Sequence, residues 1–216
     1  MTTRIETLET RIHGRYLYEE RDSGKLLIGF HGYAESADAH LAELRQIPGI
    51  DSWSLVAVQA LHPFYTRVGT VVASWMTSLD RELALADNIA YVRRIVDALP
   101  PAQTLVFAGF SQGASMAARA AAAVRPTAGL ILLGGDIPPD VQDDASVRLP
   151  PVLLARGLRD EWYTEEKLKK DSSYLKGRTE VTECVFEGGH EWNEEVREAM
   201  GEFLQTIADA STPPSS

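Results

Sequence analysis

The chain has 216 residues, 44% of them hydrophobic and 24% charged, which suffices for one sizeable soluble domain. Its net charge of −10 argues against a general affinity for nucleic acids or anionic membranes. Cys184 is the only cysteine, which excludes a disulfide within the chain and fits a reducing compartment.

Apolar runs alternate with helical patterns along the chain. Strands are predicted at residues 11–19, 26–30, 55–58, 105–108, 129–133, 151–155 and 180–186. Helices are predicted at residues 36–46, 83–99, 112–124, 164–175 and 193–207. The helix at 83–99 is expected to bury one stripe, formed by Leu85, Ile89, Val92, Val96 and Leu99. The last helix is expected to face the core with Val196, Met200, Phe203 and Ile207.

This alternation predicts an α/β fold whose central sheet is mostly parallel and flanked by helices. We expect one domain over residues 1–210 and a disordered tail over residues 211–216. Ligands of such sheets bind at the carboxyl ends of the strands, so the site is expected after Phe30, Ala108, Leu133, Ala155 and Phe186. The polar first residues lack a signal-peptide core and no apolar run could cross a bilayer, so a cytoplasmic protein without stable membrane insertion is predicted.

The stretch Gly109-Phe110-Ser111-Gln112-Gly113 lies between a predicted strand and a predicted helix. This is the Gly-x-Ser-x-Gly nucleophile elbow, a strained turn that lifts a serine hydroxyl out of the sheet. Side chains at either glycine position would collide with the neighbouring strand or helix. Ser111 is therefore the candidate nucleophile, and it needs a base to remove its proton.

The base should be a histidine late in the chain, because this arrangement runs serine, acid, histidine. Of the five histidines only His190 follows the last predicted strand, in the loop Glu187-Gly188-Gly189-His190-Glu191-Trp192. The two glycines allow this loop to bend until the imidazole reaches Ser111. His190 is therefore the candidate base.

The acid should follow a strand that lies between the serine and the histidine. Asp160 follows the strand at 151–155 and would accept the Nδ1 proton of His190, which fixes the tautomer. Asp136 follows the preceding strand in Leu133-Gly134-Gly135-Asp136 and could also reach the histidine. Asp160 is preferred, and Asp136 stays an alternative.

Acyl transfer also needs hydrogen-bond donors for the oxyanion. One is expected to be the backbone N–H of Gln112, at a helix N-terminus. The second should come from residues 31–36, the oxyanion loop, where the N–H of Tyr33 is the first choice and that of Ala34 the next. His31 is expected to brace this loop by hydrogen bonding.

Metal and nucleotide cofactors are not expected. His190-Glu191 begins like a zinc-binding His-Glu-x-x-His motif, but Glu194 replaces the second histidine. A single cysteine leaves no thiolate cluster, and no Gly-x-Gly-x-x-Gly follows a strand. The predicted chemistry therefore needs no metal and no cofactor.

The chain resembles the α/β-hydrolase superfamily and, within it, the phospholipase/carboxylesterase family, which includes acyl-protein thioesterases and small bacterial carboxylesterases. The resemblance spans roughly residues 20–208 and rests on four motifs: His31-Gly32-Tyr33, Gly109-Phe110-Ser111-Gln112-Gly113-Ala114, Gly157-x-x-Asp160 and Gly188-Gly189-His190. It implies a minimal core without a lid and hydrolysis of carboxylic esters or thioesters without a cofactor, and it favours Asp160 over Asp136 as the acid.

The chain departs from the family pattern at two places. Ala34-Glu35-Ser36 stands where members usually carry glycine and an acid, so the resemblance leaves the shape of the oxyanion loop open. Ser74-Trp75-Met76 resembles a Ser-Trp-Phe segment of the acyl pocket, but Thr77 replaces an expected aspartate. Aromatic residues expected near the site could line an apolar substrate pocket, above all Trp75, Phe64 and Trp162, and also Tyr65 and Trp192.

These features predict a serine hydrolase that cleaves esters or thioesters of modest acyl chain length through an acyl-enzyme intermediate. A catalytically silent ligand-binding protein is one alternative, because fold does not determine function. A peptidase or an acyltransferase with the same triad is another. The expected partner is a small-molecule acyl ester or thioester rather than nucleic acid, and a homodimer stays open.

Overall fold

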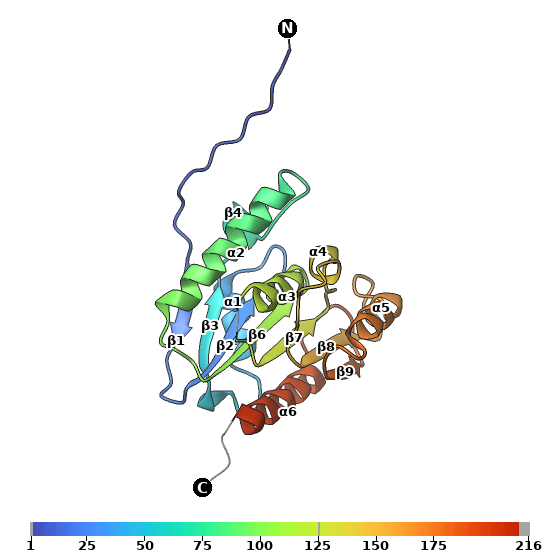
Figure 1. Ribbon diagram of the computed structural model, residues 1–216. Helices are drawn as coiled ribbons and strands as arrows, with labels where there is room; N and C mark the ends of the chain where they lie inside the picture. The colour runs from blue at the N-terminus through green and yellow to red at the C-terminus, as the bar shows by residue number, and fades with distance from the viewer. Residues whose placement is uncertain (1, 125, 212–216) are drawn as a thin grey trace.

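A seven-stranded sheet lies at the centre of the computed structural model, which describes residues 2–124 and 126–211 (Figure 1). Its strand order is β1-β3-β2-β6-β7-β8-β9. The strands are β1 (Tyr16–Glu19), β2 (Lys25–Phe30), β3 (Ser54–Val58), β6 (Thr104–Phe110), β7 (Gly129–Leu133), β8 (Val152–Gly157) and β9 (Val181–Phe186). Every neighbouring pair is parallel except β1 and β3, which confirms the mostly parallel sheet.

Helices cover both faces of this sheet (Figure 1). They are α1 (Ala37–Leu44), the 3-10 helix η1 (Ile50–Ser52), α2 (Arg81–Ala98), α3 (Gln112–Ala123), α4 (Pro139–Gln142), α5 (Glu165–Leu175) and α6 (Glu194–Ser211). One apolar cluster joins one face of the sheet to α2, α3, α4 and α5, and a second cluster joins the other face to α1 and α6. Alternate residues along the buried strands therefore serve two cores.

Three sequence predictions need correction. The first strand begins only at Tyr16, and a short antiparallel hairpin of β4 (His62–Tyr65) and β5 (Val71–Ser74) was not predicted. The stripe of α2 is rotated: its fully buried residues include Asn88 and Ile95, whereas Leu85, Ile89 and Val96 are half-buried. The side-chain amide of Asn88 donates to the Trp75 carbonyl oxygen, so a satisfied polar group occupies a position that periodicity assigns to an apolar one.

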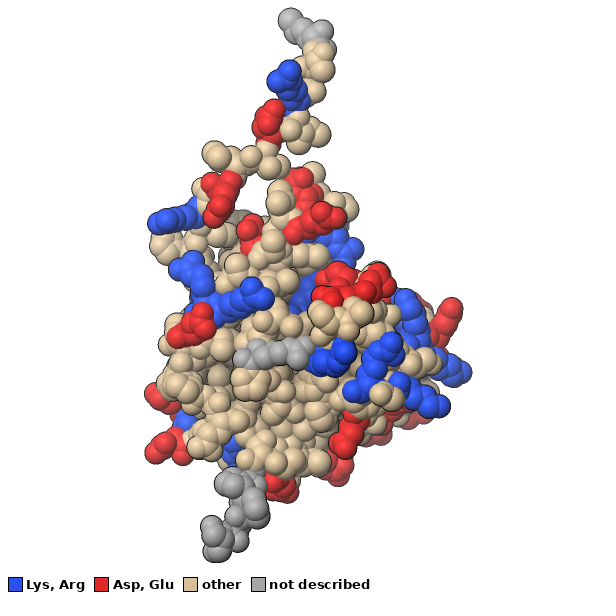
Figure 2. Space-filling model, in the orientation of Figure 1, with Lys and Arg blue, Asp and Glu red and all other residues tan. Residues whose placement is uncertain are grey.

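The predicted inward face of α6 is confirmed, since Val196, Met200, Phe203 and Ile207 are all buried. Ser211 ends that helix, and the rest of the tail predicted at 211–216 lies outside the described residues. Residues 2–15 are exposed and form no regular structure (Figure 1). On the face shown in Figure 2, basic and acidic side chains lie interspersed among uncharged residues. Within the described residues, no helix is both long and apolar enough to span a bilayer.

A buried histidine lies between α1 and the sheet. The imidazole of His40 packs against Gly29 of β2 and lies edge-on to Trp192, with 5.6 Å between the ring centroids. Neither ring nitrogen has a hydrogen-bond partner among the described residues. Burial lowers the pKa of His40 from 6.5 to about 3, because the charged imidazolium would lose its hydration there.

This histidine should make the protein less stable in acid. Below pH 6.5 His40 becomes protonated in the unfolded chain, whereas in the folded protein it stays neutral until about pH 3. Because the unfolded state binds the extra proton, acidification favours unfolding. We expect wild type to lose about 2 kcal/mol relative to His40→Leu between pH 7 and pH 5. Urea unfolding of both proteins across this range measures the difference. His62→Gln, at an exposed histidine, is the control, and parallel stability curves for wild type and His40→Leu would contradict the assignment.

Candidate active site

Ser111 alone connects the end of β6 to the start of α3. Its backbone has φ 55° and ψ −119°, a conformation that residues other than glycine rarely adopt. Its N–H donates to the Leu133 carbonyl oxygen of β7 at 2.8 Å, which fixes the turn. Strain of this kind is typical of functional sites.

The two glycines of the elbow are required by close backbone contacts. A Cβ atom on Gly113 would lie less than 3.0 Å from the carbonyl oxygens of Phe30 and His31 at the end of β2. A Cβ atom on Gly109 would come equally close to the Gly113 carbonyl group. The start of α3 therefore packs directly against the neighbouring strand, as the sequence pattern predicts.

His190 and Asp160 are joined by a hydrogen bond. His190 Nδ1 lies 2.8 Å from Asp160 Oδ2, and the Asp160 side chain is almost completely buried. The other carboxylate oxygen, Oδ1, accepts hydrogen bonds from the backbone N–H groups of Trp162 and Tyr163 at 2.8 and 2.9 Å. Because Asp160 Oδ2 accepts a hydrogen bond from the Nδ1–H group, Nε2 of the neutral His190 ring is left as a hydrogen-bond acceptor.

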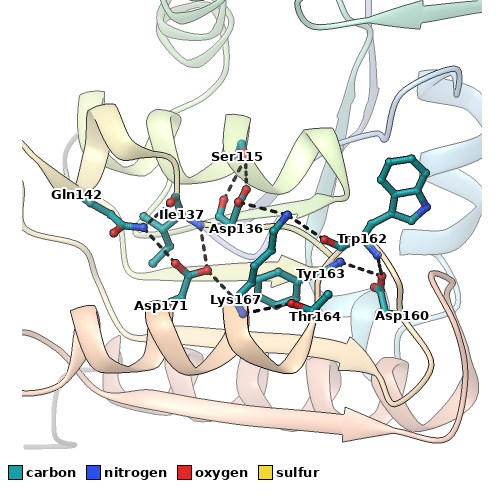
Figure 3. Close-up of polar contacts among 10 residues, drawn as sticks. All are labelled: Ser115, Asp136, Ile137, Gln142, Asp160, Trp162, Tyr163, Thr164, Lys167 and Asp171. Atoms are coloured by element: carbon teal, nitrogen blue, oxygen red, sulfur yellow. Dashed lines mark hydrogen bonds and ion pairs between the residues drawn. The ribbon is translucent and has the colours of Figure 1, made fainter.

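Asp136 takes a different place. Its carboxylate lies 3.8 Å from Lys167 Nζ and within 3.4 Å of the Ser115 hydroxyl, and about half of its side chain is exposed (Figure 3). The structure thus brings Asp160 to His190 and holds Asp136 in a surface ion pair.

The loop after β7, residues 134–138, lies between Ser111 and His190. A Cβ atom on Gly134 would lie 3.0 Å from His190 Cε1, and one on Gly135 would overlap the Ser111 carbonyl oxygen. The His190 ring also packs on Phe110, with 4.8 Å between the ring centroids. Ser111 and His190 are therefore neighbours across these two glycines, although no hydrogen bond joins their side chains in the described structure.

Two N–H groups of the oxyanion loop, those of Gly32 and Ala34, already have acceptors. Ala34 donates to the Ala73 carbonyl oxygen at 3.0 Å, and Gly32 donates to Glu35 Oε2 at 2.7 Å. The N–H of Tyr33, between them, has no acceptor among the described residues. Ala34 has φ 60°, so this loop holds the left-handed conformation that favours glycine even though alanine stands there.

The N–H of Gln112 also has no acceptor in the part of the chain that the structure describes, because the first residue of a helix has no partner within that helix. The structure therefore excludes Ala34 as a donor in this conformation and leaves the Tyr33 and Gln112 N–H groups available. His31 braces the loop as expected: its Nδ1 donates to the Gly32 carbonyl oxygen at 2.6 Å, and its Nε2 accepts from the Ala60 N–H at 3.1 Å. Burial lowers the pKa of His31, so the neutral ring is favoured.

No protein-family model matches the sequence, and no curated protein matches it significantly. Solved structures do match it. Esterase PE8 superposes with a TM-score of 0.75 and 20% identity, covering 91% of this chain and 100% of its own. A phospholipase/carboxylesterase from Dyadobacter fermentans superposes with a TM-score of 0.69 and 19% identity, covering 89% of this chain and 97% of its own. Acyl-protein thioesterase 2 from Zea mays superposes with a TM-score of 0.68 and 16% identity, covering 93% of this chain and 100% of its own.

The chain has the α/β-hydrolase fold. This confirms the fold class predicted from the sequence. In this fold the candidate residues stand where parallel strands end: Ser111 after β6, Asp160 after β8 and His190 after β9.

The three aromatic residues predicted for the substrate pocket lie in different surroundings. The Trp75 indole is completely buried, and its Nε1 donates to the His31 carbonyl oxygen at 2.8 Å, so it supports the oxyanion loop from the core side. Phe64 is half-buried and packs on Tyr33, with 5.6 Å between ring centroids. Trp162 is 73% exposed beside Asp160. Tyr33, Phe64 and Trp162 therefore remain as candidates for substrate contact, and Trp75 as a packing residue.

One set of contacts was missed by sequence reasoning. The Gln112 side chain accepts from the Trp75 N–H at 2.9 Å and donates to the Met76 carbonyl oxygen at 3.0 Å. Asn88 holds the Trp75 carbonyl oxygen from the other side at 2.7 Å. These contacts fix the segment after β5 against the elbow. The only sequence signal for them is the glutamine after Ser111, whose side chain could equally have faced solvent.

Proposed function

We propose that this α/β-hydrolase is a serine hydrolase of the phospholipase/carboxylesterase family, which cleaves carboxylic esters or thioesters of modest acyl chain length. The observation that carries the proposal is the 2.8 Å hydrogen bond between His190 and the buried Asp160, beside a serine held in a strained elbow. The structural neighbours named as carboxylesterases and as a thioesterase support the same reaction class.

In this mechanism the Ser111 hydroxyl oxygen attacks the acyl carbonyl carbon while His190 Nε2 takes the hydroxyl proton. Asp160 holds the imidazolium that forms and keeps its Nδ1 proton directed at Oδ2. The carbonyl oxygen gains negative charge, and the free N–H groups of Tyr33 and Gln112 are the donors that would bind it. His190 then gives its proton to the departing alcohol or thiol, which leaves an acyl-serine.

Hydrolysis of the acyl-serine repeats these steps with water. His190 takes a proton from water, the hydroxide oxygen attacks the acyl carbon, and the returned proton restores the Ser111 hydroxyl as the carboxylic acid leaves. The same two backbone donors serve both steps. The packed aromatic pair Tyr33 and Phe64, next to these donors, favours an apolar acyl group of modest size.

A panel of chromogenic substrates tests this function. We expect turnover of p-nitrophenyl esters with short and medium acyl chains and of acyl thioesters, with a higher kcat/KM than for peptide p-nitroanilides. Ser111→Ala, which keeps the backbone turn, is the matched control and should lose turnover of all of them. Faster cleavage of the peptide amides would support a peptidase instead, and folded protein without any turnover would support a ligand-binding role.

A further inference from the structure

A second buried carboxyl group lies behind the His190–Asp160 pair. Asp171, on α5, is 1% exposed, and among the described residues no basic side chain forms an ion pair with it. Its neighbours are instead three neutral donors (Figure 3). Oδ2 accepts from the Tyr163 hydroxyl at 2.9 Å and from the Ile137 N–H at 3.2 Å, and Oδ1 accepts from Gln142 Nε2 at 3.1 Å.

Tyr163 connects this carboxylate to Asp160. Tyr163 belongs to the acid loop, residues 158–164, and is itself buried. Its N–H donates to Asp160 Oδ1 at 2.9 Å, its carbonyl oxygen accepts from Arg156 Nε at 2.9 Å, and its hydroxyl donates to Asp171. Figure 3 shows the tyrosine spanning the space between the two aspartates. Asp171 therefore helps to fix the position of one of the two N–H groups that hold Asp160 Oδ1.

The hydrogen bond between Ile137 and Asp171 connects Asp171 to the His190 side of the His190–Asp160 pair. Ile137, whose N–H donates to Asp171, lies in the loop after β7. The His190 ring packs against Gly134 of the same loop, three residues before Ile137. One carboxylate thus fixes both the acid loop and the loop that supports His190. A carboxylate that only capped a helix would not contact both the acid loop and the loop after β7.

We propose that Asp171 is a positioning residue for the proposed hydrolase, whose carboxylate holds these two loops so that Asp160 stays aligned on His190. The inference rests on the proposed function for its catalytic consequence, but the contacts themselves do not. Asp171 touches neither the substrate site nor the reacting atoms, and it acts through Tyr163 and Ile137.

The charge of this carboxylate should matter as well as its shape. Burial raises the pKa of Asp171 to about 6, and the nearby Asp136 adds to this, while the hydrogen bonds from Ile137 and Tyr163 and the positive Lys170 oppose it. Tyr163 stays protonated, because burial and the negative Asp171 raise its pKa, so it remains a donor. Protonation of Asp171 in mild acid would therefore weaken the hold on both loops.

The kinetic test compares wild type with Asp171→Asn between pH 5 and pH 8, with the best p-nitrophenyl ester. We expect kcat to be lowered about tenfold at pH 8 with little change in KM, a size typical for groups that orient a catalytic group from behind. At pH 5 about nine-tenths of the wild-type protein would carry a protonated Asp171, which is neutral like the asparagine. The difference in kcat between wild type and Asp171→Asn should therefore shrink to about twofold. His190 is present in both proteins, so its own contribution to activity cancels in the ratio of the two kcat values.

Glu43→Gln is the control for a merely structural effect, because it removes an ion pair with Arg197 between α1 and α6 on the opposite face of the sheet. It should lower stability without a pH-dependent change in the kcat ratio. A deficit in Asp171→Asn that stays constant from pH 5 to pH 8 would overturn the inference, even if esters are hydrolysed.

A second measurement does not need activity. The backbone amide resonance of Tyr163 is followed by NMR from pH 5 to pH 8 in His190→Ala protein, where Asp160 has no imidazole beside it. We expect a shift with a midpoint near pH 6 that disappears when Asp171→Asn is added. If that shift occurs but the wild-type protein hydrolyses no ester, the positioning contact stands and the proposed function fails. If no shift occurs, the inference fails.

Discussion

Asp160→Asn is expected to lower kcat for an acyl ester about 10⁴-fold and to leave the fold intact. The reason lies in the two backbone N–H groups that donate to Asp160 Oδ1. They would hold the amide oxygen of the substituted side chain, so its amide NH₂ group would face His190 Nδ1. Nδ1 would then have to accept a hydrogen bond, the ring proton would move to Nε2, and His190 could no longer take the Ser111 proton.

Steady-state kinetics on a p-nitrophenyl ester measure this loss, and circular dichroism checks that the variant is folded. Asp136→Asn is the matched control, since it removes the alternative acid from a half-exposed ion pair with Lys167. Exposed pairs contribute little, so this change should cost less than about fivefold. A larger loss in Asp136→Asn than in Asp160→Asn would show that the acid has been assigned to the wrong residue.

Gly113→Ala is expected to destabilise the protein by about 3 kcal/mol or more. The added methyl group would overlap the carbonyl oxygens of Phe30 and His31, which are backbone atoms at the end of β2 and cannot swing aside. Relief requires α3 to move away from the sheet, which would also displace the Gln112 N–H. Protein that still folds should therefore have lower activity as well.

Urea unfolding tests this effect, with Gly189→Ala as the matched glycine-to-alanine control. A Cβ atom on Gly189 would meet nothing within 4 Å, and its φ lies outside the left-handed region. We expect Gly189→Ala to change the free energy of unfolding by less than about 1 kcal/mol. Equal unfolding midpoints for the two variants would contradict the close packing of α3 on β2.

Local patterns were sufficient to predict the strands that carry the candidate site. Their apolar runs are continuous because both faces are buried, and the glycines of the elbow follow from contacts that any such turn must make. The order of the strands in the sheet could not be predicted from the residues, since it depends on the direction of each crossover. The hairpin of β4 and β5 was missed because His62-Pro63-Phe64-Tyr65 is short, mostly exposed and contains proline.

Buried polar groups were the least predictable part of the site. Asp171 stands in Lys169-Lys170-Asp171-Ser172-Ser173, a run that is typical of a solvated helix face. Its carboxylate is buried because α5 packs against the acid loop, the loop after β7 and α4. Trp75 shows the opposite case, because an aromatic residue expected at a pocket is used to brace the oxyanion loop from the core.

Labelling with a fluorophosphonate, followed by mass mapping of the modified peptide, tests most directly whether Ser111 is an activated nucleophile. We predict rapid modification of wild type at Ser111, none at Ser115 one helical turn away, and loss of labelling in His190→Ala. Folded protein that is not labelled, or is labelled equally in His190→Ala, would contradict the proposed mechanism.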